Sequence, residues 1–177
     1  MLRTILAYGA IAGVIVGVPM LIGNTLIQGD APIAVSMAVG YATMLVALSM
    51  VFLGVKRHRD TAGGGIIKFW PALGIGLAIS IVASLFYVAT WELTQAVTGH
   101  TFAADYTRTL IEQKLAAGAS AEEIATFRAQ MADFAVQYAD PLYRLPVTFI
   151  EIFPVGVLVS VISAALLRNP RILPARA

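Results

Sequence analysis

Four long, continuously apolar stretches constrain the fold of this chain more than any other feature of its sequence. They lie at residues 5–27, 33–55, 70–94 and 146–167. Each is about 22–25 residues long, or about 33–38 Å of α-helix, and can cross a hydrocarbon core about 30 Å thick. Backbone groups in lipid must be hydrogen-bonded within their own segment, and these stretches lack the alternation of a transmembrane β-strand. The sequence therefore predicts an all-α integral membrane protein with four transmembrane helices.

The composition excludes the main soluble classes. Hydrophobic residues make up 59% of the 177 residues and charged residues 12%, whereas a soluble domain has about 45–50% and about 25%. A chain of this size leaves about a third of its surface in water, so a soluble fold could not cover so much apolar surface. The same composition excludes disorder. The lack of cysteine excludes a disulfide-stapled domain and any haem-thiolate, iron–sulfur or cysteine-type zinc site.

The first apolar stretch follows Arg3 and shares that feature with a signal peptide. Its apolar run is longer than a typical signal core, however, and no clear Ala-x-Ala cleavage site follows it. Gly9, Gly13 and Gly17 recur every four residues, which places them on one helix face and allows close helix contact. We therefore expect a helix that is retained in the membrane.

Basic residues set the expected orientation. The two ends of the chain and the connection at 56–68 carry eight Lys and Arg residues, whereas the segment at 95–145, hereafter the outer segment, carries four. The positive-inside rule then places both termini in the cytoplasm and the outer segment outside. This asymmetry accounts for the pI near 9.1 without a nucleic-acid partner. Contact of the basic connection with anionic lipid headgroups is the alternative interpretation.

The outer segment is the one soluble-looking part of a single domain over 1–177. Phe102, Tyr106 and Leu110 recur every four residues, as on one face of a helix. Ser120 and Glu123 then form a capping box that starts a second helix. The segment is thus predicted to be an amphipathic helical hairpin, inserted between the third and fourth spans.

An apolar stripe runs along the second helix of this hairpin at spacings of three and four residues. Its members are Ile124, Phe127, Met131, Phe134 and Tyr138. The polar face of the same helix is mainly acidic, whereas a helix lying on lipid usually carries Lys and Arg there. We expect the stripe to be an outer docking face that rests on protein, either on this bundle or on a partner.

The connections at 28–32 and 63–65 also predict local structure. The turn at 28–32 suits a tight hairpin, because its aspartate can cap the second helix and its proline fits the first turn. The glycine run at 63–65 predicts a flexible or tightly turned stretch. It lacks the spacing of a phosphate-binding loop, so we prefer flexibility to that interpretation. Trp70 and Trp91 are expected to mark the two interfaces of the third span.

Glu151 is the strongest candidate for an intramembrane polar or ion site. It is expected about five residues into the fourth span, about 7–8 Å from its start, where a carboxylate is costly unless it is paired, hydrated or protonated. Pro154 removes the helical donor for the carbonyl of Ile150. Together they could bind a cation or relay protons, but we prefer a structural Glu151 that is hydrogen-bonded to another helix. Glu92 is expected to be solvated at the headgroups, with pairing near Glu151 as the alternative.

Small residues are expected to form packing seams. On the third span these are Ala72, Gly76, Ser80 and Ser84, and on the fourth they are Gly156, Ser160 and Ala164. Pro19 and Asn24 in the first span could line a cavity, although prolines are common in membrane helices.

No constellation of catalytic or metal-binding residues is evident. His58 and His100 are predicted to lie on opposite sides of the membrane, so they cannot share a metal. Nucleophile triads, His-Glu-x-x-His and paired aspartates are all missing. We therefore expect no enzyme activity, no cofactor and no metal.

Several strings of residues together resemble a known family. They are Arg59-Asp60 with its glycine run, Tyr87-x-x-x-Trp91, Gly118-Ala119-Ser120 and the string from Glu151 to Gly156. The chain is similar, over nearly its whole length, to a family of small bacterial four-helix membrane proteins catalogued as a domain of unknown function (number 4199). The resemblance implies a multipass protein of the bacterial inner membrane and transfers no catalytic residues.

The lack of catalytic chemistry favours an accessory or interaction subunit of a membrane assembly, or a self-associating scaffold. Its expected partners are membrane lipids and either another membrane protein or further copies of the chain. The alternative is a small transporter or channel that uses Glu151 beside the kink in the fourth span. The spans carry few ionisable groups and no evident inverted repeat, which disfavours transport.

Overall fold

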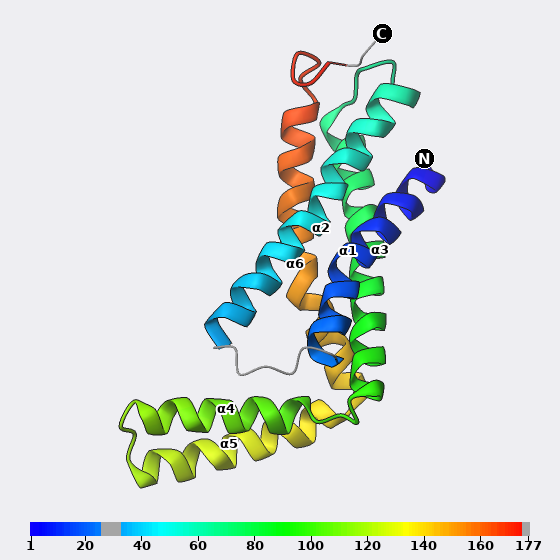
Figure 1. The fold of residues 1–177 in the computed structure, drawn as a ribbon. Coiled ribbons are helices and arrows are strands. Elements are labelled where there is room, and N and C mark those ends of the chain that lie inside the picture. Colours follow the sequence, from blue (N-terminus) through cyan, green and yellow to red (C-terminus); the bar gives the residue numbers. More distant parts are fainter. Residues whose placement is uncertain (26–32, 175–177) are drawn as a thin grey trace.

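The computed structural model describes residues 1–25 and 33–174, and these residues form an all-helical protein without a strand (Figure 1). Its helices are α1 (Leu2–Thr25), α2 (Ile33–Ala62), α3 (Phe69–Val97), α4 (Phe102–Ala116), α5 (Ala121–Ala139) and α6 (Pro141–Leu167). Of these, α1, α2, α3 and α6 are long and apolar enough to cross a membrane. The predicted fold class is therefore confirmed. The turn predicted at 28–32 lies outside the described residues.

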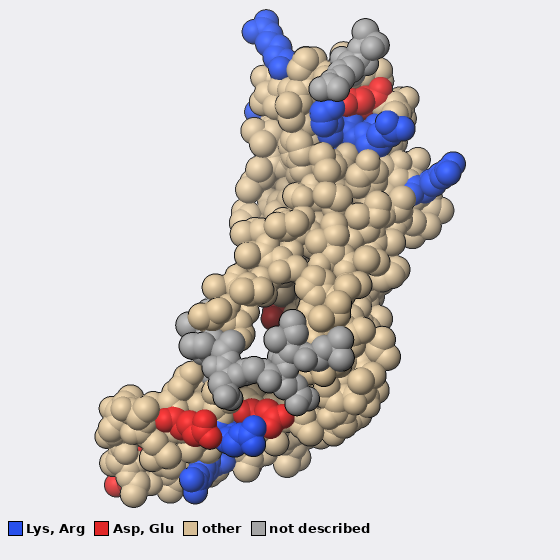
Figure 2. Space-filling view, viewed as in Figure 1, with Lys and Arg blue, Asp and Glu red and all other residues tan. Residues whose placement is uncertain are grey.

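Helix α3 is the centre of the bundle. It packs against α1 and against α6, while α2 packs on α1 and α6. Both ends of the chain and the α2–α3 connection lie at one end of the bundle, and α4 and α5 lie at the other (Figure 1). Lys and Arg gather at the first end, and the face shown in Figure 2 has a broad belt without charged side chains between the two ends.

The α1–α3 contact depends on three glycines spaced four residues apart. A side chain added at any of them would collide with α3: Gly9 with Val82, Gly13 with Phe86, and Gly17 with Thr90. The approach is closest at Gly13, where an added Cβ would lie 2.2 Å from the Cβ of Phe86. Only glycine lets the two helices lie this close together, because lipid supplies no hydrophobic force between helices and contact must come from packing.

The α3–α6 contact has a reciprocal pattern of glycine and serine. An added Cβ at Gly76 would lie 2.9 Å from the Cβ of Ser160, and one at Gly156 would lie 2.7 Å from that of Ser80. The Ser80 hydroxyl lies 3.0 Å from the carbonyl of Gly76 and 3.2 Å from that of Gly156, to either of which it can donate. It also lies 3.2 Å from the Ser160 hydroxyl. The serines therefore satisfy their own polar groups at the close approach.

Arg59 near the end of α2 is fully buried. Its guanidinium pairs with Asp60 at 2.8 Å and donates to the carbonyl of Ile172 at 2.9 Å and to that of Leu173. Buried charges are tolerated when they are paired and hydrogen-bonded. Arg59 thus holds the chain after α6 against the end of α2 by hydrogen bonds to its main chain.

The glycine run after α2 forms a tight turn. The amides of Gly63 and Gly65 donate to the carbonyl of Arg59 at 3.1 and 3.0 Å. Gly64 and Gly65 have φ values of 59° and 85°, which glycine adopts without strain. Of the two conformations that the sequence left open for this run, flexible or tightly turned, the structure has the tight turn.

Helix α6 begins at Pro141, earlier than the predicted span at 146–167. Asp140 caps it by accepting from the amide of Leu142 at 2.9 Å, and Pro141 occupies the first helical position. The apolar run alone did not reveal this start because the first turn contains Arg144. Glu151 therefore lies ten residues after the helix start, about 15 Å along the axis, and the predicted depth of about 7–8 Å was too shallow.

Candidate functional site

The hairpin of α4 and α5 lies across one end of the bundle and extends sideways beyond it (Figure 1). Within the predicted stripe on α5, Ile124 and Tyr138 are buried, whereas Phe127, Met131 and Phe134 are half-buried. The α4–α5 contact is more extensive than the α5–α6 contact. Most of the stripe is therefore covered by α4 of the same chain, and only the Phe134–Tyr138 end packs with α3, in the cluster around Trp91.

An aromatic cluster joins this end of the hairpin to the bundle. Trp91 of α3 donates its indole N–H to the hydroxyl of Tyr138 of α5 at 2.7 Å. Phe102 of α4 packs edge-on against Trp91, with ring centroids 4.9 Å apart, and lies 5.7 Å from the Tyr138 ring. Burial raises the pKa of Tyr138, so its hydroxyl stays neutral. Trp91 is therefore buried against protein instead of marking a lipid interface as predicted.

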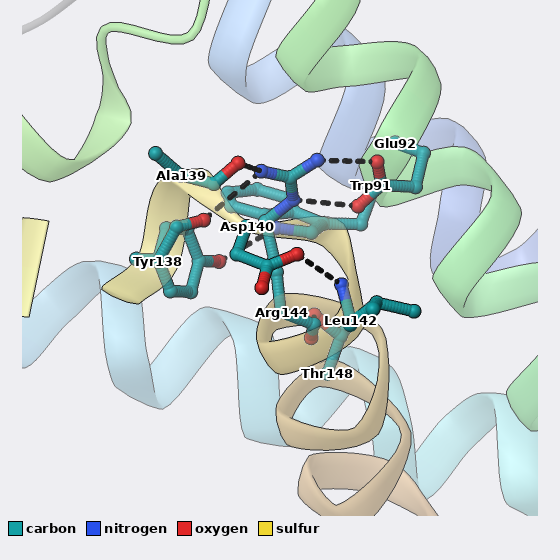
Figure 3. Close-up of polar contacts among 8 residues, drawn as sticks. All are labelled: Trp91, Glu92, Tyr138, Ala139, Asp140, Leu142, Arg144 and Thr148. Atoms are coloured by element: carbon teal, nitrogen blue, oxygen red, sulfur yellow. Dashed lines mark hydrogen bonds and ion pairs between the residues drawn. The ribbon is translucent and has the colours of Figure 1, made fainter. Parts of the chain in front are cut away.

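Arg144 and Glu92 complete the attachment (Figure 3). Arg144 of α6 is 2% exposed and donates from Nε and Nη2 to the two carboxylate oxygens of Glu92 at 2.7 and 2.6 Å. Its Nη1 donates to the carbonyls of Tyr138 and Ala139 at 3.0 and 3.3 Å. The guanidinium thus joins α3, the end of α5 and the start of α6. We call Trp91, Glu92, Tyr138 and Arg144 the outer junction.

The outer junction corrects two interpretations of the sequence. Glu92 is neither simply solvated nor paired with Glu151, because it forms a bidentate ion pair with Arg144. Arg144 was counted only as a charge of the outer segment. An arginine close to an apolar run is a signal for a buried partner, but 52 residues separate it from Glu92 and no helical spacing links them.

A groove of about 600 Å³ follows the hairpin on one face. Its lining is mainly apolar and includes Ala103, Thr107, Ile111, Met131, Ala132 and Ala135. Arg108 and Arg128 also line it. The groove lies outside the bundle, on the part of the chain that projects sideways, and it is therefore accessible to another molecule.

Glu151 lies near the middle of α6 and is exposed. The hydroxyl of Tyr87 on α3 lies close to its carboxylate. No Lys or Arg forms an ion pair with Glu151 within the residues that the structure describes. Pro154, one turn further along α6, leaves the carbonyl of Ile150 without its helical donor. A carboxylate and a carbonyl that lacks its helical donor therefore belong to neighbouring residues near the middle of α6.

The exposure of Glu151 results from an opening between helices. The outer half of α2 diverges from α1 and α6 (Figure 1), and every residue from Val35 to Ala42 is exposed. On the face shown in Figure 2 the molecule is hollowed at this level, and an acidic side chain is visible inside. Glu151 is itself exposed.

The remaining candidates do not converge on one site. His58 lies in α2 and His100 lies after α3, at the opposite end of the bundle. No group of three His, Asp or Glu residues in 1–25 and 33–174 could hold a metal ion. Asn24 of α1 donates to the carbonyl of Met20 on an exposed part of the helix, so its amide is used within its own helix.

Comparison with known proteins gives one match. Residues 7–169 match the family described as "Protein of unknown function (DUF4199)". This is the family that the sequence strings resemble. No curated protein and no solved structure matches the chain.

Proposed function

The chain belongs to the family of proteins of unknown function DUF4199, and from this premise we propose that it is an accessory or interaction subunit of a membrane assembly. The α4–α5 hairpin is the arm that binds the partner. In this proposal the protein lies in a bacterial inner membrane with both termini in the cytoplasm. The clustering of Lys and Arg at the end that holds the termini supports that orientation (Figure 2).

The observation that carries this proposal is the attachment of the hairpin at one end only. Its base is fixed by the ion pair of the buried Arg144 guanidinium with Glu92, by the indole–hydroxyl hydrogen bond, and by the edge-on contact of Phe102 with Trp91. Beyond this base the hairpin extends past the bundle and carries the mainly apolar groove. A fixed arm with an accessible apolar groove suits protein recognition, because preorganisation reduces the entropy cost of binding.

The polar groups of the bundle support a structural role more than a catalytic one. Ser80 and Ser160 form hydrogen bonds at the close contact of α3 and α6. Arg59 and Arg144 use their guanidinium groups on carboxylates and main-chain carbonyls. These groups stabilise the packing within the chain. We assign the binding of a partner to the groove on the hairpin.

Photo-crosslinking in native membranes tests the proposal. A photoreactive residue is placed at Ala132 or Thr107 in the groove, with Gln130 on the exposed face of α5 as the matched control. We expect the groove positions to give a discrete adduct with another membrane protein, and Gln130 to give much less of it. Adducts with lipid alone, or equal adducts from all three positions, would contradict the proposal.

A transporter is the second candidate, and the exposure of Glu151 at mid-depth is the observation that favours it. Purified protein in proteoliposomes separates the two candidates. The interaction subunit alone should give no proton or cation flux above that of empty vesicles. A flux that Glu151→Gln abolishes, with the protein still folded, would establish transport instead.

A further inference from the structure

The outer half of α2 differs from the other candidate spans in its packing. In α3, buried residues recur along the whole helix, and in α1 they recur as far as Gly17, whereas the eight successive residues Val35–Ala42 of α2 are exposed on every face. Burial in α2 begins only at Met44. Exposed apolar residues are not themselves unfavourable in lipid, since lipid tails are as apolar as leucine. The feature that demands an explanation is the polar group beside this half-helix.

That polar group is the carboxylate of Glu151. It lies ten residues after the start of α6 and sixteen before its end, so neither interface is close. The hydroxyl of Tyr87 on α3 lies close to it, and no Lys or Arg pairs with it within the described residues. A single hydrogen bond compensates only in part for a carboxylate in the membrane, and intramembrane acids are usually paired with a base or hydrated in a cavity.

This chain has no base to offer at that depth. Its Lys and Arg residues lie near the ends of the candidate spans or in the connections, and Arg144 is already paired with Glu92. The undescribed residues 26–32 contain neither Lys, Arg nor His. A second copy of the chain has the same distribution, so it could not place a cation opposite Glu151 either.

We propose that the opening between the outer half of α2 and α6 receives a transmembrane helix of another protein, and that this helix carries a Lys or Arg at the depth of Glu151. The inference rests on the proposed function and specifies its partner. Two features fit a helix as the occupant. Ser36 and Gly40 are four residues apart on α2, and a side chain added at Gly40 would meet nothing within 4 Å. This surface allows a second helix to approach closely.

The pairing also gives a reason for the location of Glu151 beside Pro154. The partner's cation would face a carboxylate and the carbonyl of Ile150, which lacks its helical donor. Both groups are acceptors, and an ammonium or guanidinium has only donors. The chemistry of the opening is therefore complementary to a cation and poorly suited to a second acid.

The test places a photoreactive residue at Val39, an exposed residue of the unpacked half of α2, in native membranes. The expected adduct is with a membrane segment of another protein that contains a Lys or Arg. Glu151→Gln keeps the shape of the side chain but removes its negative charge. It should therefore bind the partner's cation more weakly and reduce this adduct about tenfold. Glu122→Gln, on the exposed surface of α5 and outside the groove, is the matched control and should leave the adduct unchanged.

A reciprocal exchange makes the test specific. Glu151→Lys should abolish the adduct, and replacing the partner's basic residue by Glu in the same cells should restore it. Adducts with lipid only, with a second copy, or with a segment lacking Lys and Arg would overturn the inference, as would an adduct that Glu151→Gln does not change. If Ala132 still crosslinks a partner in that case, the proposed function stands and only this inference fails.

Discussion

At the scale of single residues, the two buried arginines both use their guanidinium nitrogens in hydrogen bonds and ion pairs. Arg144 bonds to both oxygens of Glu92 and to two main-chain carbonyls. Arg59 does the same with Asp60 and the chain after α6. The pairing of Arg144 with Glu92 could not be predicted from sequence spacing, since the partners come from separate helices. The same holds for the contact of Arg59 with the chain after α6, which lies 113 residues away. The capping box at Ser120 and Glu123 could be predicted, because both members lie within one turn.

Arg144→Ala should destabilise the protein, because it leaves Glu92 without its cation and two carbonyls without a donor. Removing one partner of a buried pair costs about 3–5 kcal/mol, and the 30% exposure of the Glu92 side chain should reduce this to about 1–3 kcal/mol. Thermal unfolding in mild detergent measures the effect, with the exposed Arg128→Ala as control. Equal unfolding temperatures for the two variants would contradict the structural role of the outer junction.

At the scale of helices, the sequence predicted which segments form helices better than how they pack. Continuous apolar runs identified the four candidate spans, and apolar residues recurring every three or four positions identified α4 and α5. A helix that is apolar on every side does not show which face is packed, so the divergence of α2 at Val35–Ala42 could not be foreseen. The start of α6 was missed for a related reason, because its first turns contain Arg144 and resemble a loop.

Gly13→Ala tests the contact between α1 and α3. The added methyl group would lie 2.2 Å from the Cβ of Phe86, so the helices must separate, and overpacking of this kind costs about 1–3 kcal/mol. Gly74→Ala is the matched control, because an added Cβ there meets nothing within 4 Å and alanine favours a helix over glycine. We expect a lower unfolding temperature for Gly13→Ala only. A loss of the same size in both variants would indicate that the α1–α3 contact is not the cause.

At the scale of the whole molecule, one end carries most of the basic residues and the other carries the hairpin (Figures 1 and 2). The bundle supplies a fixed base, and its two candidate binding surfaces are the groove on the hairpin and the opening beside Glu151. Both lie away from the packed centre around α3. This division explains why the fold could be predicted from hydropathy while the partner surfaces could not.

The orientation of the whole molecule can be tested by two fusions. A phosphatase that is active only in the periplasm, joined at Ala119 between α4 and α5, should be active. A fluorescent protein that folds only in the cytoplasm, joined after Ala177, should fluoresce. The reason is the excess of Lys and Arg at the end that holds the termini. Silence of both fusions, with expression confirmed, would reverse the orientation.

The central claim is that this protein works as a subunit bound to another membrane protein. The most direct measurement is native mass spectrometry after extraction from its own membrane into polymer-bounded lipid discs, with no detergent step. We predict a particle that contains the 18.8 kDa chain together with a different membrane protein, and loss of that second protein when the groove residue Ala132 is replaced by a bulky Arg. A particle that contains only this chain, as a single copy or as several, would contradict the account.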